Sequence, residues 1–165
     1  MKTIQRVAQR YLKAQELEEP ITPMERFQDL LAYLRMMHMA HWTNHWQVKG
    51  DPQYSDHLLF QRLYEAMPDE IDGLAEKIVA EYGPEAVAMP EQMERIASET
   101  DMLFEEETDL LERAIMMEET LQADLQEIFT ILDESGNLSL GMNDYLAALA
   151  NAHETNLYLL RQRTR

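Results

Sequence analysis

The sequence predicts an all-α fold, and three observations support that class. Glycine and proline are scarce, with five and six among 165 residues. Residues of high helix propensity dominate, and apolar residues recur every three or four positions. No stretch shows the alternating β-branched pattern of successive strands. At this length we expect one domain over 1–165, with an N-terminal extension over 1–21 and a bundle over 22–162.

Local signals bound the first predicted helices. An amphipathic helix over 3–17 is broken by the sequence EEPITP. Thr22 then fits an N-cap, with Pro23 at the first helical position and Glu25 at the third, which is the capping-box arrangement. We expect this helix to run to about Val48.

The next predicted helix contains most of the candidate functional residues. Ser55 is expected to cap it after a turn that contains glycine and proline, and we expect it to run to about Tyr82. Pro68 lies inside it, removes a backbone hydrogen bond and should kink it one turn before Asp72. Its expected core residues are Leu59, Leu63, Met67, Leu74 and Ile78.

A long connection over 83–99, in which Pro90 opens a short helix, precedes two further predicted helices over about 101–134 and 139–161. His153 lies on the apolar stripe of the last helix, so we interpret it as structural. The expected core residues of these two helices are Phe104, Leu111, Ile115, Leu121, Leu125, Ile128 and Leu132, then Met142, Leu146, Leu149, Leu157 and Leu160.

Several function classes are excluded by missing residues and motifs. The chain has no cysteine, which removes disulfides, thiolate zinc sites and cysteine nucleophiles. It has no HExxH, no Walker loop and no GxGxxG. The basic N-terminus lacks the apolar core of an export signal, and the most apolar segment is interrupted by Arg35 and histidines. We therefore expect a cytoplasmic protein, with association with the nucleoid as an alternative, and no membrane span.

The net charge of −17 is unevenly distributed. Residues 1–16 and residues 161–165 each carry +3, so the body between them carries −23. Such a body repels nucleic acid, and only the termini could contact phosphate. We expect DNA binding to be weak or absent.

The stretch from His41 to Glu76 contains the candidate metal ligands. Imidazole and carboxylate together suit iron, manganese or zinc, and the candidates are His45, His57, Asp72 and Glu76. On one helix His57 and Asp72 are about 22 Å apart, so a single copy cannot close one site. Two antiparallel copies related by a twofold axis would join the halves and create two equivalent sites. The other interpretation of such spacing is an ordinary solvated helix face.

Three histidines continue the apolar stripe of the helix over 22–48. The stripe is Phe27, Leu31, Leu34, His38, His41 and His45. We expect its end to face a metal or a partner subunit, with His38 structural. Trp42 and Trp46 beside it are expected to pack in an interface.

The sequence HWQVKG, a histidine twelve residues after His45, and the carboxylates of DGLAEKI together resemble the Dps family of mini-ferritins. The resemblance covers most of the chain and implies a ferritin-like four-helix bundle with a short helix in the long crossover. It implies that His45, His57, Asp72 and Glu76 are inter-subunit ferroxidase ligands, with Glu76 bridging two irons. Gln61 stands where the family usually has aspartate, so it offers only a carbonyl oxygen to the second iron.

The resemblance also implies function and assembly. It implies a shell of twelve identical subunits that oxidises Fe²⁺ with hydrogen peroxide or dioxygen and stores Fe³⁺, with zinc or manganese as substitutes for iron. Asp144 matches an acidic position that lines the threefold pore in Dps shells.

A full-size ferritin is disfavoured because no histidine here has glutamate three residues before it. The remaining alternative is a non-catalytic helical shell or a DNA-associated structural protein with an impaired ferroxidase site.

Overall fold

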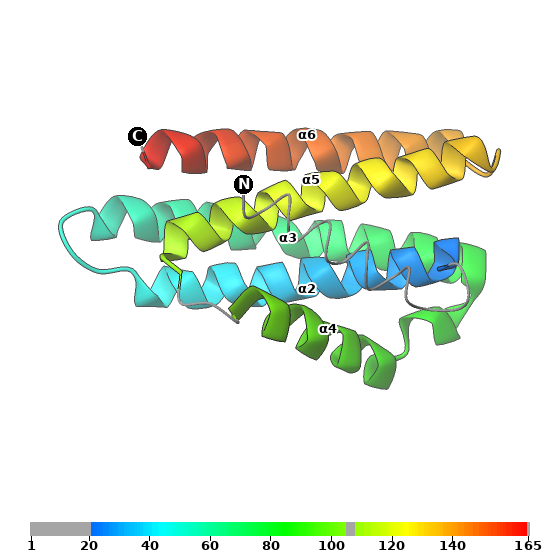
Figure 1. Cartoon of the computed structure of the whole chain (residues 1–165), viewed down its shortest axis with the longest axis horizontal. Helices are drawn as coiled ribbons and strands as arrows, with labels where there is room; N and C mark the ends of the chain where they lie inside the picture. The colour runs from blue at the N-terminus through cyan, green and yellow to red at the C-terminus, as the bar shows by residue number, and fades with distance from the viewer. Residues whose placement is uncertain (1–20, 105–107, 165) are drawn as a thin grey trace. The chain divides into compact units, whose positions relative to one another are not determined.

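The computed structural model describes residues 21–104 and 108–164, and every regular element in these ranges is helical (Figure 1). The all-α prediction is therefore confirmed. The predicted helix over 3–17 lies outside the described residues. The elements are α2 (Pro23–Gln47), α3 (Gln53–Tyr82), the 3₁₀ turn η1 (Pro84–Val87), α4 (Met89–Phe104), α5 (Leu110–Glu134) and α6 (Leu140–Arg163).

The chain divides into two compact units. One contains residues 28–114 and therefore most of α2, α3, η1 and α4. The other contains the described residues 21–27 and 115–164, and therefore most of α5 and α6. The organisation as one domain over 1–165 stays a prediction.

The start of α2 has the predicted capping box. The backbone N–H of Glu25 donates to Thr22 Oγ1 at 3.2 Å, and the backbone N–H of Thr22 donates to Glu25 Oε2 at 2.8 Å. Two N–H groups that the helix itself leaves without partners are thus satisfied. Downstream, Phe27, Leu31 and Leu34 are buried as predicted. His41 and His45 are also buried within the chain, whereas His38 is half-buried.

We expect Thr22→Ala to lower the free energy of unfolding by about 1 kcal/mol, because it removes the acceptor for the Glu25 N–H. Thermal unfolding should then shift down by about 2–4 °C. Thr155→Ala is the matched control, since Thr155 is exposed within α6 and donates only to a carbonyl of its own helix. Equal midpoints for the two variants would show that the cap contributes nothing.

Helix α3 is longer at its start than predicted. It begins at Gln53, and Ser55 lies in its first turn, where its hydroxyl donates to the carbonyl oxygen of Pro52. The prediction that Ser55 caps the helix is therefore wrong. The helix continues through Pro68 to Tyr82, as predicted, and the kink stays a prediction. Its buried residues are Asp56, Phe60, Leu63, Met67, Leu74 and Ile78, so Phe60 takes the core position predicted for Leu59.

A buried polar network fixes the crossover after α3 against α2. Gln28 donates from Nε2 to the carbonyl oxygen of Ala86 at 2.9 Å, and Gln92 donates to the carbonyl oxygen of Gln28 at 3.2 Å. Arg95 pairs with Asp29 and also donates to Gln28 Oε1 at 3.1 Å. Polar groups buried with partners in this way give η1 and α4 one defined position on α2.

The boundary between α4 and α5 differs from the prediction of one helix over 101–134. Helix α4 reaches Phe104, and α5 begins at Leu110, with Asp109 Oδ1 accepting the backbone N–H of Leu111 at 2.9 Å. Phe104 is exposed and stacks under the Arg113 guanidinium at 4.2 Å, so it is not the core residue we predicted. Burial lowers the pKa of Arg113.

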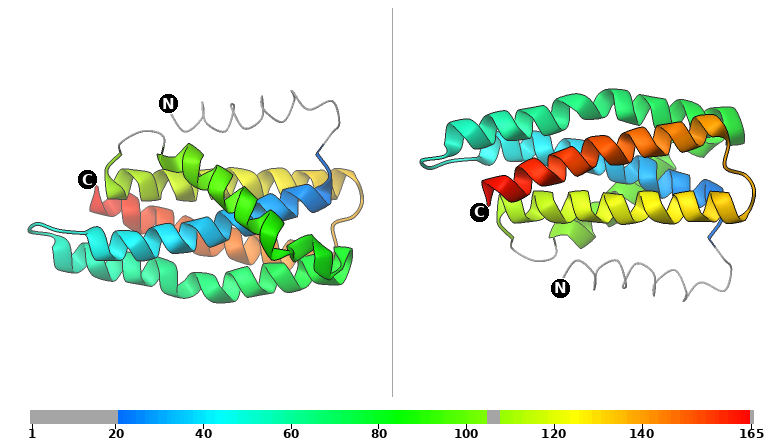
Figure 2. Two further views of the ribbon diagram at one scale, coloured as in Figure 1. Left: turned by 90° about the horizontal axis from the view of Figure 1, so that it is seen from below. Right: turned by 90° about the horizontal axis from the view of Figure 1, so that it is seen from above.

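Helices α5 and α6 run antiparallel, joined by a tight turn (Figures 1 and 2). Gly136 has φ of 70° in that turn, and Ser139 caps α6 by accepting the N–H of Met142 at 3.1 Å. The predicted core of both helices is largely confirmed: Leu121, Leu125, Ile128, Leu132, Leu146, Leu149, Leu157 and Leu160 are buried. Leu111, Ile115 and Met142 are only half-buried.

Among the described helices, none is long and apolar enough to cross a membrane.

Candidate metal centre

His45 and His57 form a reciprocal pair across the turn between α2 and α3. His45 Nδ1 donates to the carbonyl oxygen of His57 at 2.8 Å, and His57 Nδ1 donates to the carbonyl oxygen of His45 at 2.9 Å. The rings stack with centroids 3.5 Å apart and planes 24° apart. A carbonyl oxygen only accepts, so each Nδ1 carries a hydrogen, and in the neutral imidazole the lone pair is then on Nε2. The pair therefore presents two nitrogen ligands of fixed tautomer.

The local sequence explains this pairing. Helix α2 ends at Gln47, two residues after His45, and α3 begins at Gln53, four residues before His57. Gly50, with φ of 87°, lies in the turn that reverses the chain between them. A separation of twelve residues thus places the two rings opposite each other at the same end of the hairpin.

Aromatic side chains stand beside the pair. Tyr64 meets His45 edge to face at 5.3 Å, Trp42 stacks on Tyr64 at 5.8 Å, and Trp46 lies 5.2 Å from Trp42. His38 contacts Trp42 and Tyr64, and burial lowers its pKa, which favours the neutral ring. Trp46 is 64% exposed and Trp42 43% exposed, so the outer part of this group is open to solvent in one chain.

Asp72 and Glu76 lie at the far part of α3. Both are exposed and, four residues apart, share one face of the helix. Since α3 is continuous, Asp72 lies about 22 Å along the helix from His57. Across residues 21–104 and 108–164, no three histidines and carboxylates of one chain gather in a group that could hold a metal. One chain therefore brings the two histidines together but not the four predicted ligands.

Gln61 and Asp144 were also predicted at functional positions. Gln61 is half-buried on α3, one turn after His57, and its Nε2 donates to Glu65 Oε1 at 2.6 Å. Asp144 is exposed near the start of α6, and its pore role stays a prediction.

A buried pair of a glutamate and a histidine joins α5 and α6, and the sequence analysis did not predict it. Glu118 on α5 and His153 on α6 are 0% and 1% exposed, and Glu118 Oε2 lies 2.6 Å from His153 Nδ1. His153 was predicted to be structural, and its burial agrees with that interpretation. The sequence does contain a sign of this pair: Glu118 lies on the apolar stripe formed by Ala114, Met117 and Leu121. A carboxylate on such a stripe needs a buried partner.

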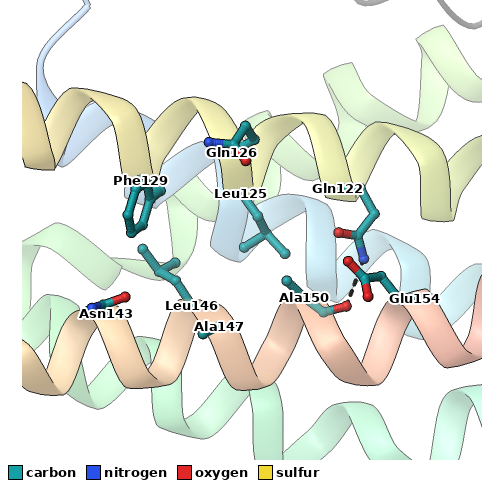
Figure 3. Close-up of a pocket in the computed structure, with 9 residues that line it drawn as sticks. All are labelled: Gln122, Leu125, Gln126, Phe129, Asn143, Leu146, Ala147, Ala150 and Glu154. Atoms are coloured by element: carbon teal, nitrogen blue, oxygen red, sulfur yellow. Dashed lines mark hydrogen bonds between the residues drawn. The ribbon is translucent and has the colours of Figure 1, made fainter.

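An open groove between α5 and α6, of about 220 Å³, has a different character (Figure 3). Its polar side chains are three amides and Glu154, and Gln122 Nε2 donates to the carbonyl oxygen of Ala150 at 2.9 Å. With one carboxylate and no imidazole, it lacks the ligands of a metal centre. Its apolar residues are Leu125, Phe129, Leu146, Ala147 and Ala150.

No protein-family model matches the chain, and no curated protein is significantly similar to it. Solved structures do match. The Dps protein of Vibrio cholerae O1, described as a member of a broad superfamily of ferritin-like diiron-carboxylate proteins, has a TM-score of 0.72 at 16% identity, over 87% of this chain and 89% of that one. The chain has the ferritin-like fold of the Dps proteins.

Two further Dps structures agree. A Listeria innocua Dps variant with two histidines replaced by glycine gives a TM-score of 0.72 at 17% identity, over 88% of this chain and 96% of that one. Dps from Thermosynechococcus elongatus gives a TM-score of 0.69 at 21% identity, over 87% of this chain and 90% of that one. The Dps resemblance and the ferritin-like bundle predicted from the sequence are thus confirmed as a fold.

Proposed function

We propose that this protein is a mini-ferritin: it binds Fe²⁺ between subunits, oxidises it with hydrogen peroxide or dioxygen, and stores Fe³⁺ inside a shell of identical subunits. The observation that carries the proposal is the reciprocal His45–His57 pair, which holds two Nε2 lone pairs ready at one place. A histidine that only stabilises packing does not require a second imidazole stacked on its ring.

The carboxylates for this site come from a second chain. Asp72 and Glu76 are exposed on α3, about 22 Å along the helix from His57. A twofold axis that pairs two antiparallel α3 helices would bring Asp72 and Glu76 of one subunit to the histidines of the other. Two imidazoles with two carboxylates form a ligand set that suits Fe²⁺, and the negative charge favours Fe³⁺ once it forms.

The names of two similar structures agree with the residue types of this site. The Vibrio cholerae protein belongs to a diiron-carboxylate superfamily, and the Listeria innocua variant has glycine in place of two histidines that are twelve positions apart. His45 and His57 have the same separation.

In the proposed reaction, iron is the substrate and the ligands differ in role. His45, with Asp72 and Glu76 of the other subunit, binds the first Fe²⁺. The second binds to His57, the far oxygen of Glu76 and the carbonyl oxygen of Gln61, and is held more weakly because Gln61 is neutral. Each Fe²⁺ gives up one electron, and the O–O bond of peroxide breaks as it takes both electrons and two protons to form two waters.

DNA binding has little part in this function. Arg161, one of the basic residues of the C-terminal end, pairs with Glu119 at 2.8 Å, which offsets part of the positive charge at that end.

We propose a cytoplasmic location and a twelve-subunit shell, with zinc or manganese able to replace iron.

The proposal is tested by adding Fe²⁺ and peroxide to the assembled protein and following ferric absorbance, together with the mass in solution. A ferroxidase shell oxidises iron far faster than buffer does and has the mass of an oligomer. A helical scaffold, the alternative, would give only the buffer rate. A monomer in solution would contradict both the assembly and the shared site.

A further inference from the structure

Gln61 has a defined orientation, and Glu65 sets it. The two residues are one turn apart on α3, and Gln61 Nε2 lies 2.6 Å from Glu65 Oε1. A carboxylate only accepts hydrogen bonds, so the amide must turn its nitrogen to Glu65 and its oxygen away. His57 lies one turn earlier on the same helix, which makes His57, Gln61 and Glu65 a row with a spacing of four residues.

We propose that Glu65 is a positioning residue for metal binding: it holds the Gln61 amide so that the carbonyl oxygen serves the second metal position beside His57. This inference rests on the proposed function. A glutamine amide that is free to turn must be ordered when the cation binds, because only its oxygen can be a ligand and its NH₂ group repels a cation. Fixing the amide removes the wrong orientation.

The bond to Glu65 also compensates for the missing charge at this position. An amide that donates to a carboxylate becomes more polarised, which makes its oxygen a better ligand, as outer partners do for metal-bound histidines. Glu65 is exposed, so its carboxyl group is solvated and pays no cost of burial. A neutral ligand with an anionic partner can thus take the place of an aspartate.

The simpler interpretation is that Glu65 belongs only to the exposed acidic face of α3, which also contains Asp69. In that case either carboxylate attracts cations by charge alone, and the two residues are interchangeable. The positioning role requires instead a hydrogen-bond acceptor at residue 65 and assigns none to Asp69.

The test is a calorimetric titration of the assembled protein with Co²⁺, which is not oxidised under these conditions and reports each binding step. The wild type should show a tighter and a weaker site. Glu65→Ala should weaken the second step about 10–100-fold and leave the first unchanged. Glu65→Gln carries no charge and can accept from Gln61 in only one of its two amide orientations, so it should recover only part of that loss. Asp69→Ala should bind as the wild type does.

Three outcomes decide the matter. An unchanged second step in Glu65→Ala overturns the positioning role, and so does an equal loss in Asp69→Ala. If the wild type binds no Co²⁺ at all, the proposed function itself fails, and this inference fails with it. Folding of each variant is checked by its helical circular dichroism and by its mass in solution.

Discussion

Glu76→Ala should abolish fast oxidation of Fe²⁺. In the proposed site Glu76 is the one ligand that both irons share, so its loss weakens both positions together. Removing a residue that only orients a ligand typically costs 10–100-fold, and removal of a bridging ligand should cost at least about 100-fold. The rate of ferric absorbance increase after addition of peroxide measures this effect.

Glu81→Ala is the matched control, since Glu81 is another exposed carboxylate near the end of α3. It should oxidise iron at the wild-type rate. Wild-type oxidation by Glu76→Ala would make an inter-subunit ferroxidase untenable, and His45 and His57 would then be assigned to packing.

His153→Leu should lower the free energy of unfolding by about 3–5 kcal/mol. His153 and Glu118 are both fully buried and 2.6 Å apart, so removal of the imidazole takes this partner from a buried carboxylate. Thermal unfolding of the assembled protein should shift down by roughly 10 °C. Arg161→Ala, which removes the exposed pair with Glu119 on the same two helices, should cost less than about 1 kcal/mol.

The double variant Glu118→Leu/His153→Leu distinguishes the pair from simple loss of packing. Apolar residues can replace a buried ion pair at little cost, so the double variant should be more stable than His153→Leu alone. Losses that add across the two positions would show that the residues contribute independently.

Local sequence signals predicted the elements that depend on local chemistry. The capping box at Thr22 and the length of α3 as far as Tyr82 follow from hydrogen-bond partners and helix periodicity within a few residues. The His45–His57 spacing also carries real information, because a short turn with Gly50 fixes which helix positions meet across it.

The prediction of one helix over 101–134 failed, and two side-chain partners were not predicted. The acidic residues before Leu110 are compatible with a continuous helix, and nothing local shows that Asp109 begins a new one. Glu118 is buried because His153, far along the chain, pairs with it. The hydrogen bond from Gln61 to Glu65 was not predicted either, because spacing alone does not show which exposed side chains pair.

A site that takes its ligands from two chains can be restored by mixing two inactive variants. One variant lacks the histidine half (His45→Ala with His57→Ala), and a second lacks the carboxylate half (Asp72→Ala with Glu76→Ala). Each alone should be inactive. When equal amounts are dissociated and reassembled together, half of the twofold interfaces should be mixed, and each mixed interface has one complete site and one site without ligands.

The rate of Fe²⁺ oxidation by the reassembled mixture is the decisive measurement for a site shared between two chains. We expect about a quarter of the wild-type rate, whereas the same two variants mixed without dissociation should stay inactive. A reassembled mixture of native mass that oxidises iron no faster than buffer would contradict a site shared between subunits.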